Sequence, residues 1–152
     1  MLRESVTYQL ASIAEDAVGS AERLFRGRFG LNVHELRVLR LIDDQPAVNF
    51  TSLARQTKFE RSATSRILSR LIKEGLVRRE IDEADARHFQ LFATPAGKAL
   101  RAAADPLSLE LEEVVLSALT ATERAEFRRL LDKLSLWLAS GYVTEMNSRY
   151  KD

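Results

Sequence analysis

The sequence predicts a mainly α-helical fold with a small β component (α+β), and two observations support this class. Over most of the chain, apolar residues recur at steps of three and four, which gathers them on one face of a helix. Between residues 76 and 93 this spacing stops, and two short runs of branched and aromatic residues flank a polar connection of hairpin length. Hydrophobic residues form 45% of the 152-residue chain and charged residues 30%, as in a globular protein.

The chain should begin with a long amphipathic helix over residues of about 4–27, with Gly27 and Gly30 marking its end. A second helix should open at Asn32. Asn32 and Glu35 have the spacing of a capping box, in which each side chain accepts a hydrogen bond from the other residue's backbone amide.

A helix-turn-helix is expected over residues of about 49–75. Asn49 is suited to cap a short third helix, because its side-chain oxygen can accept from an unpaired amide of the first turn. After a turn at residues 57–60, a fourth helix should begin at Arg61 and end at Gly75, which can adopt the left-handed conformation of a helix end.

Residues 76–81 and 88–93 are expected to be the two strands of a hairpin, a wing over residues of about 76–94. Thr94 and Pro95 suit the cap and first position of a fifth helix, expected over residues of about 95–118. Pro106 lies inside that helix and should kink or break it.

A last helix over residues of about 120–148 should start at the capping box of Thr120 and Glu123. No linker or repeat divides the chain, so one domain is expected over residues 1–148. Three helices followed by a hairpin form the winged helix-turn-helix layout, here with long helices at both ends of the chain.

The fourth helix combines an apolar face with a face of small hydroxyls and cations. Short side chains allow close approach to a surface, and arginine, serine and threonine are common partners of bases and phosphates in the major groove of DNA. An ordinary solvated helix face is the alternative interpretation of this segment. The apolar face holds Ala63, Ile67, Leu68, Leu71 and Ile72, and the polar face holds Ser62, Ser65, Arg66, Ser69, Arg70 and Lys73.

The net charge of +1 conceals an uneven distribution along the chain. Residues 55–79 contain eight Lys and Arg against two Asp and Glu, a net charge of +6. Residues 1–54 carry −1 and residues 80–152 carry −4. A basic block in a nearly neutral chain favours binding of a polyanion, although such blocks are often only solvated surface.

In order and spacing, several segments together resemble the MarR family of bacterial transcription regulators over nearly the whole chain. The matching segments are Leu53-Ala54, Ser62 to Arg66, Leu71 to Val77, the pattern Asp82-x-x-Asp85-x-Arg87, and Ala93 to Leu100. The resemblance implies that Arg87 inserts into the minor groove and that Asp85 holds it there. Where the family often continues with a second arginine, this chain has His88, a candidate for protonation near neutral pH or a strand residue without a special role.

The resemblance further implies a cytoplasmic homodimer that binds double-stranded DNA at an inverted repeat, usually as a repressor released by a small, often aromatic effector. The effector should bind around the first two helices and the start of the fifth. The alternative to a repressor is a transcriptional activator. DNA contacts are expected near base edges from Ser62, Thr64, Ser65 and Arg66, and near phosphates from Arg70 and Lys73. Ser69, Asp85 and Arg87 complete the expected contacts, with Arg55 and Arg61 adding positive potential.

The helices at the two ends, over residues of about 4–27, 95–118 and 120–148, carry more apolar residues than one small core obviously needs. We expect them to form the dimer interface, although they could instead pack on each other within one chain. The surplus includes Leu2, Leu107, Leu109, Leu111, Leu136, Trp137, Tyr142, Val143 and Met146.

No enzymatic activity, cofactor or metal site is expected. The chain has no cysteine and only two histidines, His34 and His88, and it lacks the common nucleophile, phosphate-loop and zinc motifs. The acidic pair Asp43-Asp44 has the position of a helix end. No apolar run is long enough for a membrane span. The alternative function is a winged-helix protein-interaction module without specific DNA binding.

Overall fold

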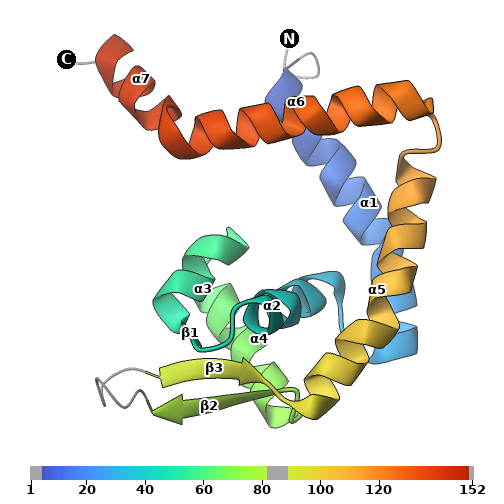
Figure 1. Ribbon diagram of the computed structural model, residues 1–152, viewed down its shortest axis with the longest axis vertical. Helices are drawn as coiled ribbons and strands as arrows, with labels where there is room; N and C mark the ends of the chain where they lie inside the picture. The colour runs from blue at the N-terminus through green and yellow to red at the C-terminus, as the bar shows by residue number, and fades with distance from the viewer. Residues whose placement is uncertain (1–4, 82–88, 151–152) are drawn as a thin grey trace. The chain divides into compact units, whose positions relative to one another are not determined.

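The computed structural model describes residues 5–81 and 89–150 (Figure 1) and divides the chain into two compact units, residues 1–111 and 112–152. Most of the described residues are helical, as predicted. The first unit contains α1 (Val6–Phe29), α2 (Val33–Asp44), β1 (Val48–Asn49), α3 (Phe50–Thr57), α4 (Arg61–Lys73), β2 (Val77–Ile81), β3 (Phe89–Ala93) and most of α5 (Pro95–Val115). The second unit contains the end of α5, α6 (Ala121–Ser140) and α7 (Tyr142–Arg149).

The predicted helix ends of the first unit are largely confirmed. Asn32 and Glu35 form both hydrogen bonds of a capping box at α2, each 2.8 Å long. The Asn49 side chain accepts from the amide of the third residue of α3. Gly30, with a φ of 70°, ends α1 in the left-handed conformation, so α1 continues through Gly27.

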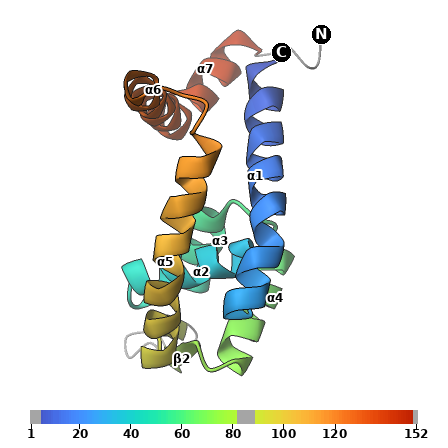
Figure 2. The ribbon, with the colours of Figure 1, turned by 90° about the vertical axis from the view of Figure 1, so that its right-hand side faces the viewer.

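A single hydrophobic core lies between the helices and the sheet of the first unit. Leu39 and Ile42 of α2, Leu53 of α3 and Leu71 of α4 are fully buried in it. Figure 2 shows the C-terminal half of α1 beside α2, where Phe25 joins the same core. This packing fixes α4 against α2 and α3, so the opposite side of α4 is left to solvent.

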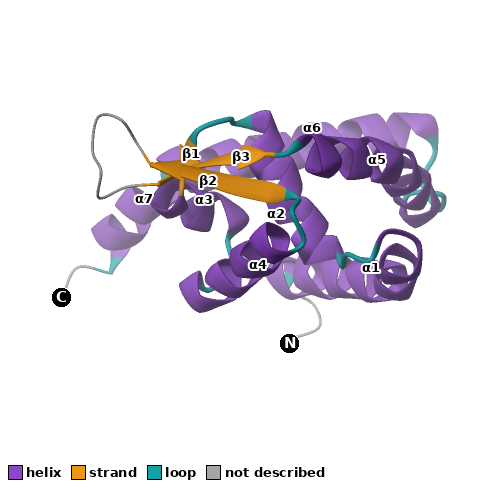
Figure 3. Ribbon diagram, turned by 90° about the horizontal axis from the view of Figure 1, so that it is seen from below, coloured by secondary structure: helices purple, strands orange, loops and turns teal. Residues whose placement is uncertain are grey.

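The sheet is antiparallel in the order β1-β3-β2, and α2, α3 and α4 lie on one side of it (Figure 3). The hairpin is confirmed, with Arg79 opposite Leu91. The short strand β1 was not predicted, because two residues are too few for an alternating pattern. It is held by the long-range pairing of Val48 with Leu91 and by a 3.0 Å bond from the amide of Ala47 to the Leu91 carbonyl.

The helix α5 begins as predicted and continues through its internal proline. The hydroxyl oxygen of Thr94 accepts a hydrogen bond from the amide of Gly97 at 3.1 Å, as an N-cap does. Pro106 does not break the helix, contrary to one form of the prediction. Ala104 and Leu107, on either side of it, are buried in the core, and this packing holds both halves of the helix in place.

The second unit is formed by helices with little burial. The capping box of Thr120 and Glu123 opens α6 as predicted. The prediction of one helix to residue 148 is wrong, because the chain leaves helical geometry at Gly141, and a side chain at this position would overlap the ring of Trp137. Neither α6 nor α7, both fully within the described residues, has a buried side chain.

Many of the exposed side chains of the second unit are apolar. Large exposed hydrophobic residues here are Val114, Val115, Leu130, Leu134, Leu136, Trp137, Leu138, Tyr142, Val143, Met146 and Tyr150. Six members of the predicted surplus are exposed: Leu109 of the first unit, with Leu136, Trp137, Tyr142, Val143 and Met146. Leu107 belongs to the core of the first unit, Leu111 packs against that core, and Leu2 lies outside the described residues. Among the helices that the structure describes, none is long and apolar enough to cross a membrane.

Candidate nucleic-acid interface

The polar side of α4 is the most distinctive surface of the first unit. Its core side is fixed by Leu71 and by the half-buried Ile67 and Leu68, so the remaining positions point outward. Short hydroxyls alternate there with cations, without any acidic side chain between Arg61 and Lys73. The predicted contact residues that are exposed on this face are Arg61, Ser62, Ser65, Arg66, Ser69 and Lys73.

Thr64 is not on this face, and its predicted contact with bases is wrong. Its side chain is fully buried, and its hydroxyl lies 3.1 Å from the hydroxyl of Thr57 on α3. Thr57 also donates to the carbonyl of Ala54 at 3.0 Å. The bond between the two hydroxyls joins the two helices of the helix-turn-helix, and the bond to Ala54 orients the Thr57 side chain. The burial could have been recognised in the sequence, because Thr64 precedes Leu68 and Leu71 by four and seven residues, the spacing of one helix face.

Arg70 has a different environment from the one predicted. Its guanidinium donates to the carboxylate of Glu35 at 2.8 Å and to the carbonyl of Gly30 at 2.9 Å. Its donors are thus directed to the junction of α1 and α2, whereas a phosphate contact was expected. No local pattern signals this pair, because the two side chains are separated by 35 residues.

The predicted minor-groove residues Asp85 and Arg87, like His88, lie outside the residues that the structure describes, so their roles stay predictions. On the described part of β2, two adjacent arginines differ in their contacts. Arg78 lies over the ring of Phe92 and forms an ion pair with Glu80. Arg79 lies over the ring of Phe89, 5.0 Å from its centroid.

Charged side chains tie the end of α2 to α5 within the first unit. Arg101 contacts Asp43 at 2.8 Å and Asp44 at 2.6 Å, and Arg40 contacts Asp105 at 2.7 Å. Burial lowers the pKa of Arg101, but its hydrogen bonds to Asp44 and Asp43 outweigh this effect and raise the pKa, so the guanidinium remains charged. The sequence indicated only a helix end at Asp43-Asp44, because the partner lies far along the chain.

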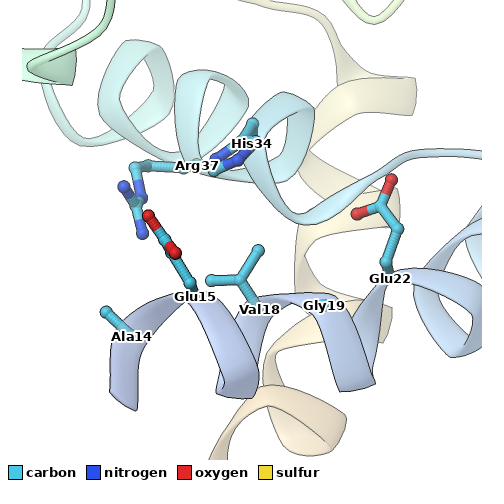
Figure 4. A pocket seen from close by; sticks show the side chains of 7 residues that line it. All are labelled: Ala14, Glu15, Val18, Gly19, Glu22, His34 and Arg37. Carbon is cyan, nitrogen blue, oxygen red and sulfur yellow. The ribbon is translucent and has the colours of Figure 1, made fainter. Parts of the chain in front are cut away.

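A hollow of about 460 Å³ lies between α1 and α2. Figure 4 shows Glu15 and Arg37 pointing toward one another across its entrance, while Val18 and Gly19 form its apolar side. His34 stands at its α2 side with its ring edge against Phe59, at a centroid distance of 4.8 Å. The buried Nδ1 atom of His34 has no hydrogen-bond partner among the described residues. A ligand in this hollow would thus meet an apolar wall, a guanidinium, an imidazole and the carboxylates of Glu15 and Glu22.

The sequence is similar to a family of transcriptional regulators and to individual members of such families. A model of the MarR family matches residues 31–89, from the start of α2 to the wing. The transcriptional regulator HosA of Escherichia coli is 33% identical over 97 residues, which are 64% of this chain and 72% of HosA. The HTH-type transcriptional repressor Rv2887 of Mycobacterium tuberculosis is 30% identical over 105 residues, 69% of this chain and 76% of the repressor.

Solved structures are similar over most of the chain. The crystal structure of Rv2887 in complex with p-aminosalicylic acid has a TM-score of 0.73 and 25% identity, covering 86% of this chain and 98% of that chain. The structure of the same protein with salicylic acid has a TM-score of 0.72 and 26% identity, covering 86% of this chain and 96% of that one.

Proposed function

This chain belongs to the MarR family of DNA-binding transcriptional regulators, and we propose that it acts as a homodimeric repressor on an inverted-repeat operator and carries out no catalysis. The observation that carries the proposal is the exposed face of α4, where hydroxyls and cations alternate without an acidic side chain. An operator lies on the chromosome, so the proposed place of action is the cytoplasm.

The polar side chains of α4 divide into two proposed roles. Ser62, Ser65 and Arg66 lie in the first half of α4, the part of a recognition helix that contacts base edges in this motif. Arg66 suits guanine, whose O6 and N7 can accept hydrogen bonds from two N–H groups of one guanidinium. Lys73 lies in the last turn and suits phosphate, which a point charge binds without reading sequence. Ser69, between them, suits either partner.

Dimerisation is supported by the unburied apolar side chains of α6. Leu130, Leu134 and Trp137 follow one another at steps of four and three, on one face of the helix, and each is more than 40% exposed. Such a stripe in an isolated chain leaves apolar area in water that a second copy can cover. A two-fold dimer would present its two α4 helices about 34 Å apart, to successive major grooves.

The hollow between α1 and α2 is the proposed effector site. Rv2887, the relative crystallised with salicylic and p-aminosalicylic acid, indicates an aromatic acid as the chemical class. In this chain, Arg37 would pair with the carboxylate of the ligand in place of Glu15, and the imidazole of His34 would form part of the wall beside the aromatic ring (Figure 4). An effector releases DNA only if it binds the DNA-free conformation more tightly than the DNA-bound one.

Protection of promoter DNA tests the proposed function. The purified protein, mixed with fragments from upstream of its own gene and neighbouring genes at a stated salt concentration, should protect one site with two-fold symmetry. Two protected half-sites should lie about one helical turn apart. Binding without any preferred position, on every fragment alike, would contradict a role as a specific regulator.

A further inference from the structure

We propose that a second hollow of the first unit, between α4, the start of α3 and the sheet, holds one segment of the DNA backbone between Arg61 and Arg79. The inference rests on the proposed DNA binding and adds Arg79 of the sheet to the phosphate contacts of the recognition helix. The hollow has a volume of about 390 Å³. Its lining consists of Asn49, Phe50, Thr51, Arg61, Ser65, Leu68, Ser69, Ile72, Arg79, Phe89 and Leu91.

The two arginines stand on different elements, and each is stacked on an aromatic ring. Arg61, the first residue of α4, lies 4.8 Å from the ring centroid of Phe50 on α3. Arg79 of β2 lies 5.0 Å from that of Phe89 on β3. A stacked guanidinium keeps its donors at the edge of its plane, so less freedom is lost when they bind a phosphate.

The positive charge of the lining favours an anion as the ligand of this second hollow. The lining contains two cations and no carboxylate. Among the residues that the structure describes, neither Arg61 nor Arg79 forms an ion pair, in contrast to Arg70 and Arg101.

The remaining lining matches a phosphodiester chain, which alternates charged phosphates with apolar sugar rings. Leu68 and Ile72 of α4 and Leu91 of β3 provide apolar surface for a sugar. Ser69 adds a hydroxyl donor for a phosphate oxygen. The hollow adjoins the face of α4 proposed for the major groove, where the backbone bordering that groove would run.

Arg78 provides a matched control on the same strand. It precedes Arg79 by one residue, so its side chain points to the other face of the sheet. It is stacked on Phe92 and forms an ion pair with Glu80, and it does not line the hollow. An Arg78→Ala variant removes the same charge from the same strand without changing the proposed phosphate site.

The test is the salt dependence of DNA affinity. In a plot of the logarithm of the DNA association constant against the logarithm of salt concentration, each lost phosphate contact should make the negative slope less steep by about 0.9. Arg61→Ala and Arg79→Ala should each show this change, and the double variant should show about twice it. The loss of affinity in Arg61→Ala and Arg79→Ala should be the same on operator and random DNA. Arg78→Ala should keep the wild-type slope. Unchanged thermal unfolding of the variants would exclude a folding defect.

A wild-type slope for Arg79→Ala, or equal changes for Arg78→Ala and Arg79→Ala, would overturn the phosphate site while leaving the regulator intact. Loss of sequence preference in the wild-type protein itself would instead overturn the proposed function. The slope on random DNA would still report on the hollow in that case, so the two failures are distinguishable.

Discussion

The guanidinium of Arg70 on α4 donates a 2.8 Å hydrogen bond to the carboxylate of Glu35, a residue only 4% exposed that also closes the capping box of α2. The same guanidinium binds the carbonyl of Gly30 at the end of α1. One side chain of the recognition helix thus joins the ends of two other helices. The angle at which α4 meets its ligand depends on this junction as well as on the hydrophobic core.

Replacing Arg70 with alanine should therefore destabilise the protein. The change leaves the Glu35 carboxylate buried without its cation, and a loss of about 1–3 kcal/mol in the free energy of unfolding is expected. The figure stays below that of a fully buried pair because the Arg70 side chain is 38% exposed. Urea denaturation measures this loss in the free energy of unfolding. Arg66→Ala, at an exposed position of the same helix, should change stability by less than about 0.5 kcal/mol, and equal losses in the two variants would contradict the account.

Arg66 and Lys73 should differ in what they contribute to DNA binding. Arg66→Ala is expected to weaken the operator complex by about 1–3 kcal/mol and to relax preference at one base pair. Lys73→Ala should lower affinity for all sequences alike. Titration of both variants against operator and random duplexes separates the two effects, and equal, sequence-blind losses would show that the roles were assigned incorrectly.

The buried hydroxyl of Thr64 should matter for stability, and the exposed hydroxyl of Ser65 for DNA. Thr64→Val keeps the shape but removes the bond to Thr57, so a loss of about 0.5–1.5 kcal/mol in unfolding free energy is expected with sequence preference unchanged. Ser65→Ala should leave unfolding unchanged and weaken DNA binding. Thermal melts measure the stability of the variants, and binding titrations measure their DNA affinity. A change of base preference in Thr64→Val would show that Thr64 contacts DNA.

The apolar face of α6 should be needed for dimerisation. Leu134→Asp places a charge in the stripe and should shift the protein toward monomer at micromolar concentration, because a buried unpaired carboxylate is costly. Ala125→Asp is the control, since nine residues at 3.6 per turn place it on the opposite side of the helix. Sedimentation velocity gives the mass, and a Leu134→Asp variant that stays as dimeric as the control would exclude this face as the interface.

An aromatic carboxylate should raise the melting temperature through Arg37. Salicylate is the probe, and its stabilising effect should be lost in Arg37→Ala, whereas Arg23→Ala, a charge change on α1 outside the hollow, should keep it. No stabilisation of the wild-type protein by a broad panel of aromatic acids would favour regulation without an effector.

Features that depend on neighbouring residues in the chain could be predicted from the sequence. The capping boxes at Asn32 and Thr120, and the left-handed end at Gly75, depend on residue types a few positions apart. The amphipathic pattern of α4 predicted its exposed face, apart from Arg70, which is directed to Glu35 and Gly30. Thr64 was expected at the DNA, although its place on the apolar side and its partner on α3 decide its burial.

What could not be predicted depends on tertiary contacts. Strand β1 exists only through pairing with β3, more than 40 residues later in the chain. Arg70 was expected at phosphate because nothing near it in the sequence indicates Glu35 as a partner. The break at Gly141 had a local signal, a glycine in a helical pattern, but a single glycine is often tolerated there.

The ratio of affinities for the protected operator and for a scrambled duplex of equal length and composition tests the central claim most directly. Measured at one stated salt concentration with the wild-type protein, the ratio should reach about a thousand or more, as for specific regulators. It should fall by about ten- to hundredfold in Arg66→Ala. A wild-type ratio near one would mean that the basic face of α4 attracts DNA only by charge, and would contradict the account.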